Sequence, residues 1–152
     1  MGTEARIEMA GFNRSAPEAR AALSALSKAV DDSGLEKALT ELIKIRASQV
    51  NGCAFCLQYH LNLARKADVS QHKLDLVAVW RDAGVFTPRE MAALAWTEAL
   101  THVTPQGVSD AAYEAVKQEF GESELVFLTT AVGSINAWNR IAMAFRFSPP
   151  IA

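Results

Sequence analysis

The sequence predicts an all-α protein that folds as one compact bundle of six to seven helices. Apolar side chains recur at helical spacing along most of the chain, and no stretch shows the strict alternation of a half-buried strand. The 152 residues suit one domain with a sizeable hydrophobic core. Since the chain contains no linker, low-complexity tract or internal repeat, we assign residues 1–152 to a single domain.

Turn and cap residues divide the chain into its predicted helices. Ser15 suits the N-cap of the first helix, and Pro17 falls in the first turn, where its missing N–H costs no intrahelical bond. Gly34 separates this helix from a second one, whose apolar residues form a single stripe. The helices that we expect span residues 16–30, 35–50, 53–66, 71–82, 87–100, 109–121 and 123–145.

The later helix starts have specific capping signals. Asn51 and Gly52 interrupt the chain, and we expect one of them to cap the helix that begins near Cys53. Residues 87–90, Thr-Pro-Arg-Glu, combine an N-cap threonine, a proline at the first helical position and a capping-box glutamate. Ser109 is expected to cap the following helix.

The last predicted helix, residues 123–145, is apolar around most of its circumference. A helix with this pattern is buried on most sides. In a small domain such a helix lies either at the centre of the core or against another subunit. We therefore expect a homo-oligomer, either a dimer, a trimer or a hexamer.

Composition excludes several classes of protein. Half of the residues are apolar and 21% are charged, as in soluble globular proteins. A net charge of −2 without a basic stripe argues against a nucleic-acid partner. The apolar stretches are far shorter than the roughly 20 residues of a membrane span, and residues 1–10 lack the apolar core of a secretory signal. We expect a cytoplasmic protein.

The two cysteines, Cys53 and Cys56, are better suited to chemistry than to structural cross-linking. A disulfide between residues three apart closes almost no loop, so it would hardly restrict the unfolded chain. On a helix the two side chains share one stripe with His60, which lies one turn after Cys56. The helix N-terminus stabilises a thiolate, most strongly at Cys53, which is also expected to be the more exposed thiol.

Two further residues could assist these thiols. His60 can accept the proton of Cys56 or stabilise its anion. Glu41, on the preceding helix, could orient the imidazole or a water molecule. Spacing alone does not select Glu41, because Lys37 and Lys44 at i−4 and i+3 equally suit an exposed salt-bridge face.

Other roles for the cysteines are also open. They could be inert buried side chains, or they could bind zinc together with His60. A structural zinc site needs four ligands, and neither His72 nor His102 has the spacing of a fourth. Haem attachment is excluded because Leu57 stands where a CxxCH motif requires histidine. We therefore predict no bound metal and no cofactor.

The chain contains a spaced pattern of chemically active residues: a glutamate is followed after eleven residues by Cys-x-x-Cys, and after three more residues by a histidine. This pattern resembles the alkylhydroperoxidase D (AhpD-like) branch of the carboxymuconolactone decarboxylase superfamily. Residues 93–101 and 137–142 are also similar to this family, so the resemblance covers nearly the whole chain. The pattern is filled here by Glu41, Cys53, Cys56 and His60.

The resemblance implies an all-α oligomer that reduces hydroperoxides with a cysteine pair. The reductant of this pair would be a thiol or a dihydrolipoyl-type protein. By the same resemblance Cys56 becomes a sulfenic acid, Cys53 resolves it, and Glu41 joins His60 in a proton relay. Phe55 departs from the pattern, since some members carry a second histidine there, and this departure is expected to weaken the relay.

The leading hypothesis from sequence is therefore a thiol-dependent peroxidase acting on a hydroperoxide. One alternative is a general CxxC disulfide oxidoreductase without peroxidase activity. Another is a redox-switch or metal-binding interaction protein. A lactone decarboxylase is a weaker match, because that reaction would leave the cysteine pair unexplained.

Overall fold

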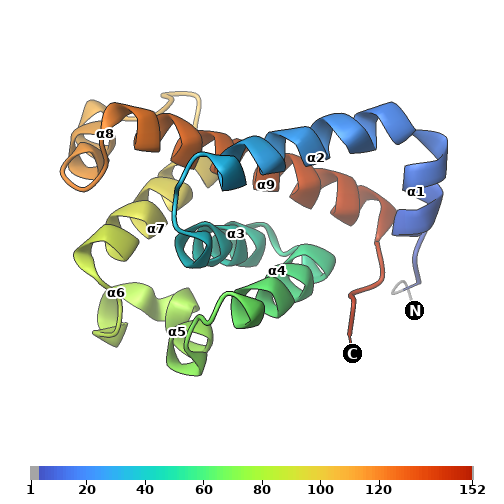
Figure 1. Cartoon of the computed structure of the whole chain (residues 1–152), viewed down its shortest axis with the longest axis horizontal. Helices are drawn as coiled ribbons and strands as arrows, with labels where there is room; N and C mark the ends of the chain where they lie inside the picture. Colours follow the sequence, from blue (N-terminus) through green and yellow to red (C-terminus); the bar gives the residue numbers. More distant parts are fainter. Residues whose placement is uncertain (1–3, 152) are drawn as a thin grey trace.

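The computed structural model of the chain describes residues 4–151 and confirms the all-α prediction (Figure 1). Within this range no β-strand forms, and an isolated bridge between Thr104 and Gly107 closes a turn. The predicted domain also includes residues 1–3 and 152, which lie outside the described part. The helices are α1 (Met9–Ser15), α2 (Pro17–Asp32), α3 (Lys37–Asn51), α4 (Ala54–Lys66), α5 (Gln71–Leu76), the 3₁₀ turn η1 (Val77–Val79), α6 (Trp80–Ala83), α7 (Pro88–Thr101), α8 (Asp110–Lys117) and α9 (Glu122–Phe145).

Helix α1 is absent from the prediction, and its presence makes the expected Ser15 cap wrong. Ser15 is the last residue of α1, and the N-cap of α2 is Ala16, whose side chain caps nothing. Phe12 holds α1 in place by packing against Trp138 of α9, with ring centroids 5.9 Å apart. This contact joins residues far apart in the sequence, so local periodicity does not indicate it.

The segment predicted as one helix over residues 71–82 is divided into α5, η1 and α6. Gly84 ends α6 in the left-handed conformation, with φ of 67°. The predicted starts of α7 and α8 are correct, because Thr87 and Glu90 form a capping box and the Ser109 hydroxyl accepts from Ala112 N–H. Helix α8 ends at Lys117, four residues before the predicted end.

Helix α3 lies at the centre of the fold, between α4 and α7 on one side and α2 and α9 on the other (Figure 1). A single apolar stripe was expected on this helix, but every residue from Leu39 to Ile45 is buried. The buried set includes Glu41 and Lys44, which are 0% and 4% exposed. Helix α3 therefore carries charged side chains into the interior.

Helix α9 packs against α3, α2, α7 and α4, which fits its predicted central position. Its exposed side still carries apolar residues, with Val126 57% and Met143 43% exposed. Between residues 4 and 151, no helix combines the length and the apolar character needed to cross a membrane.

Candidate active site

The joint between α3 and α4 places the two cysteines. Gly52 ends α3 with φ of 74°, a left-handed conformation that turns the chain sharply. Cys53 follows as the N-cap of α4, where its sulfur accepts a hydrogen bond from Cys56 N–H at 3.3 Å. Neither Asn51 nor Gly52 is the cap, which corrects the expectation from sequence. The cysteine pair thus lies at the N-terminus of a helix, as predicted.

Both thiols are free and buried, with Cys53 2% and Cys56 3% exposed. The expectation that Cys53 would be the more exposed thiol is therefore wrong. The two sulfurs differ in what they face: Cys56 contributes to the wall of a pocket, and Cys53 is absent from the described lining. A small molecule in this pocket would meet Cys56 first.

Glu41 and His60 form a buried pair across α3 and α4. His60 Nδ1 lies 2.7 Å from Glu41 Oε2. Burial alone would raise the pKa of Glu41, but the hydrogen bond and charge of its neighbours lower this pKa to about 2. Burial also lowers the pKa of His60, although the hydrogen bond to Glu41 opposes that shift.

The protonation of this pair follows from these contacts. Because an ionised Glu41 only accepts hydrogen bonds, His60 must donate from Nδ1. A neutral imidazole that carries its proton on Nδ1 keeps Nε2 as an acceptor. His60 is therefore equipped to take a proton from a group on the pocket side.

The pKa values of the two cysteines are shifted in opposite directions. Hydrogen bonding between the two thiol side chains lowers the pKa of Cys53, and backbone N–H groups at the start of α4 lower it further. The same side-chain contact raises the pKa of Cys56, as do burial and the charge of Cys53. These opposite directions favour Cys53 over Cys56 as the thiolate of the resting pair.

Glu41 does not lie on an exposed salt-bridge face. Lys37 Nζ lies 3.0 Å and Lys44 Nζ 3.7 Å from Glu41 Oε1, yet the carboxylate is fully buried. Lys37 also donates to Asp31 of α2 at 3.0 Å. The lysine spacing that suggested an exposed face in the sequence instead supplies buried countercharge.

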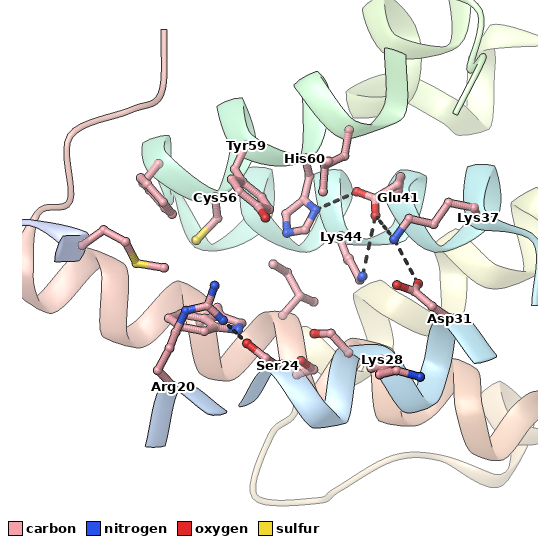
Figure 2. Close-up of a pocket in the computed structure, with 17 residues that line it drawn as sticks. Arg20, Ser24, Lys28, Asp31, Lys37, Glu41, Lys44, Cys56, Tyr59 and His60 are labelled. Carbon is pink, nitrogen blue, oxygen red and sulfur yellow. Dashed lines mark hydrogen bonds and ion pairs between the residues drawn. The ribbon is translucent and has the colours of Figure 1, made fainter. Parts of the chain in front are cut away.

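A pocket of about 320 Å³ opens between α2, α3, α4 and α9 (Figure 2). Cys56, His60 and Glu41 all line it, on the side formed by α3 and α4. Arg20 and Lys28 of α2 line the opposite side (Figure 2). Three of the four predicted site residues therefore share one pocket, and the fourth, Cys53, lies directly behind Cys56.

The structure adds residues that the sequence analysis did not select. Asn139 of α9 is fully buried, accepts from Asn51 at 2.8 Å and donates to Ser48 at 3.1 Å. Its amide also lowers the pKa of both Cys53 and Cys56 by hydrogen bonding. The resemblance of residues 137–142 to the family is the sequence signal that could have indicated it.

Phe55 lines the pocket beside Cys56, at the position where the resemblance led us to consider a histidine. Its ring stacks on Tyr59, with centroids 6.0 Å apart, and meets Phe147 edge-on at 5.4 Å. Across residues 4–151, no group of three or more Cys, His, Asp or Glu side chains is arranged to hold a metal ion.

Comparisons with known proteins agree with this architecture. The family model described as "Carboxymuconolactone decarboxylase family" matches residues 17–99. The uncharacterized protein YdfG of Bacillus subtilis is 35% identical over 129 residues, which cover 85% of this chain and 88% of that protein.

Two solved structures share the fold. One, from Agrobacterium tumefaciens, is a protein of unknown function described as a candidate antioxidant defence protein AhpD. It is 40% identical with a TM-score of 0.91, over 98% of this chain and 100% of that one. The other, a peroxidase-related protein from Ralstonia eutropha with an alkylhydroperoxidase AhpD core, is 24% identical with a TM-score of 0.80, over 91% and 74%. The chain therefore belongs to the carboxymuconolactone decarboxylase family, in its AhpD-like branch.

Proposed function

We propose that the protein is a thiol-dependent peroxidase that reduces hydroperoxides through Cys56 and Cys53. The observation that carries this proposal is that Cys56 shares one pocket with the buried His60–Glu41 pair. The relative described as an antioxidant defence protein supports the same chemistry. We further propose a cytoplasmic location, where thiol reductants keep cysteines reduced.

The first step is attack on the peroxide by Cys56. Nε2 of His60 takes the Cys56 proton, and Glu41 stabilises the imidazolium that forms. The thiolate attacks the terminal oxygen of the hydroperoxide, so an S–O bond forms and the O–O bond breaks. The leaving alkoxide takes the proton from His60. The products are an alcohol and a sulfenic acid on Cys56.

The second step is resolution by Cys53. Its lowered pKa favours the thiolate that this step requires. Cys53 attacks the Cys56 sulfur, an S–S bond forms, and the hydroxyl group leaves as water after protonation. An external dithiol of the dihydrolipoyl type then reduces the disulfide by thiol exchange and is itself oxidised to a disulfide.

The disulfide oxidoreductase alternative meets an obstacle in the burial of both sulfurs. A protein disulfide would have to reach thiols that are only 2% and 3% exposed. A small hydroperoxide has no such difficulty, because the pocket leads to Cys56. Burial therefore favours a small-molecule oxidant for the first step.

The proposal is tested by peroxide consumption with tert-butyl hydroperoxide as oxidant and dihydrolipoamide as reductant. Wild type should turn over many equivalents, and Cys56→Ser and Cys53→Ser should each abolish turnover. After peroxide treatment alone, the wild-type mass should fall by two hydrogens without gain of oxygen. Peroxide that is not consumed by folded wild type, with both thiols still free, would contradict the proposal.

A further inference from the structure

The pocket lining is electropositive in a protein that is acidic as a whole. The chain carries a net charge of −2. Four cationic side chains and two carboxylates line the pocket, so the lining carries a positive charge while His60 is neutral. The charged residues of this lining are Arg20, Lys28, Asp31, Lys37, Glu41 and Lys44.

Lys44 is the one buried cation of this set. Its side chain is 5% exposed, and its Nζ is 3.7 Å from Glu41 Oε1, beyond hydrogen-bonding distance. Glu41 already meets His60 with one oxygen and Lys37 with the other. An ammonium has three donors, and those of Lys44 are available to an acceptor that enters the pocket. No hydrogen bond from this ammonium occurs among the residues that the structure describes.

Lys44 also lies between the reacting group and the outer charges. In Figure 2 its amine points into the pocket, with Cys56 and His60 toward one end and Lys37, Asp31 and Lys28 toward the other. Burial lowers the pKa of Lys44, and the charge of Glu41 opposes that shift. A second negative charge, brought by an entering anion, would further stabilise the ammonium form of Lys44. An acceptor placed here would be within the same cavity as the Cys56 sulfur.

Apart from three serines, Tyr59 and the reacting groups, the uncharged part of the lining is apolar. Side chains of this kind surround Cys56 and extend across to α1 and α9; they are Met9, Phe55, Leu63, Ile135 and Trp138. A volume of about 320 Å³ is at the lower end of the range for small-molecule sites, about 300–1,000 Å³. The pocket thus suits a compact apolar body with one anionic group.

We propose that the substrate is an organic hydroperoxide that carries a carboxylate, and that Lys44 binds this carboxylate while the peroxide reaches Cys56. The proposal rests on the peroxidase function and specifies its substrate class. Hydrogen bonds between an ammonium and a carboxylate are charge-assisted and strong, so Lys44 determines the preference for acids over neutral peroxides.

The first test uses ligands without a peroxide group and therefore does not depend on turnover. Binding of 4-isopropylbenzoate and of 4-isopropylbenzamide to the reduced protein is measured by calorimetry. Wild type should bind the acid about tenfold or more tightly than the amide. Lys44→Met, which keeps an unbranched chain and removes the charge, should lose this preference. Lys66→Met, an exposed lysine outside the pocket, should keep it.

The second test compares cumene hydroperoxide with its 4-carboxylate derivative. Wild type should show the higher kcat/KM for the carboxylate. Because Lys44 also faces Glu41, Lys44→Met is expected to lower kcat/KM on both peroxides, but it should lower it more on the carboxylate and so remove the preference. Equal loss on both peroxides would overturn the proposal, because Lys44 would then act on the reacting oxygens. Absence of an acid preference in wild type would overturn it without any variant. Acid-selective binding without peroxide reduction would contradict the peroxidase function and leave the carboxylate site standing.

Discussion

At the scale of residues, the account depends on what His60 does for Cys56. Its Nδ1 lies 2.7 Å from Glu41 Oε2 and donates its proton to that carboxylate, which leaves Nε2 to act as a base. The resting cysteine pair favours Cys53 as the thiolate, because hydrogen bonding between the two thiol side chains lowers the pKa of Cys53. In the proposed mechanism Cys56 therefore needs a base before it can attack a peroxide.

Replacing His60 tests this role. His60→Ala should slow single-turnover peroxide reduction near pH 7 by about 10²–10⁴-fold, the usual worth of general-base assistance. The deficit should narrow at alkaline pH, where hydroxide removes the thiol proton without help. Stopped-flow measurement of the pH–rate profile checks this result.

His72→Ala is the matched control, since His72 is exposed and outside the pocket. Its profile should overlay that of wild type. If the pH–rate profile of folded His60→Ala also overlays that of wild type, His60 is a packing residue. The N-terminus of α4 is then the device that activates the thiols.

The low pKa of Glu41 predicts how the stability of the protein changes in acid. This pKa is about 2 in the folded protein, against ~4.3 for a free glutamate. Because the folded pKa is the lower one, Glu41 contributes stability above pH ~4.3, and this contribution is lost as the pH falls toward 2. The free energy of unfolding of wild type relative to Glu41→Gln should therefore drop by about 3 kcal/mol over this window.

Urea unfolding at a series of pH values measures this difference. Glu122→Gln, which removes an exposed carboxylate at the start of α9, controls for the loss of one negative charge. If the difference in the free energy of unfolding between wild type and Glu41→Gln stays constant from pH 6 to pH 2.5, the neighbours of Glu41 do not hold it ionised.

Sequence could indicate the four site residues, but it could not show their surroundings. Helical spacing placed Cys53, Cys56 and His60 on one stripe, and the family pattern added Glu41. Lys44 looked like part of a solvated face, because i−4 and i+3 lysines around a glutamate are typical of one. Its burial depends on the packing of α4, α7 and α9 around α3, which is a tertiary arrangement with no local signal.

At the scale of elements, the joint between α3 and α4 is the part of the fold that builds the site. Gly52 adopts φ of 74°, and a Cβ added there would meet nothing within 4 Å. The cost of Gly52→Ala is therefore that of the backbone conformation alone, about 1–2 kcal/mol. Helix α3 brings Glu41 and α4 brings the cysteines, so strain at this joint should also lower peroxidase activity.

Gly133→Ala is the matched substitution. Gly133 lies in the middle of α9, without a positive φ and with nothing within 4 Å of an added Cβ. Alanine should stabilise this helix by about 0.5–1 kcal/mol. In thermal or urea unfolding, Gly52→Ala should therefore lower the free energy of unfolding and Gly133→Ala should raise it. A change of the same sign in both variants would contradict the strain expected at Gly52.

Helices with strong local signals were predicted well, and those defined by distant contacts were not. The Thr87–Glu90 capping box and the long apolar run of α9 are local, and both helices occur as expected. Helix α1 has no fully buried residue and no capping side chain, so no periodic signal marks it. The break at η1 likewise has no proline or glycine to announce it.

At the scale of the whole molecule, we predict that the chain assembles with copies of itself. The exposed side of α9 presents Val126 and Met143, and burying such side chains against another subunit is favourable. Light scattering should give a multiple of the 16.5 kDa chain mass, as a dimer, trimer or hexamer. A single species near 16.5 kDa at micromolar concentration would contradict this prediction.

The whole fold serves to bury one thiol pair beside one pocket. In the proposed mechanism α3 and α4 supply the reacting groups. Helices α2 and α9 line the opposite side of the pocket (Figure 2), and α9 side chains also pack against the cysteines. This arrangement makes Cys56 the sulfur that a small oxidant meets, although Cys53 is the favoured thiolate. The proposed mechanism depends on this division of roles between the two sulfurs.

The most direct measurement of this claim is the intact mass of the two single-cysteine variants after one equivalent of hydroperoxide. Cys53→Ser should consume the peroxide once and gain one oxygen, trapped by dimedone on Cys56, because no resolving thiol remains. Cys56→Ser should leave the peroxide unconsumed and keep Cys53 as a free thiol. The reverse outcome, a sulfenic acid on Cys53 in Cys56→Ser and an inert Cys56 in Cys53→Ser, would contradict the account.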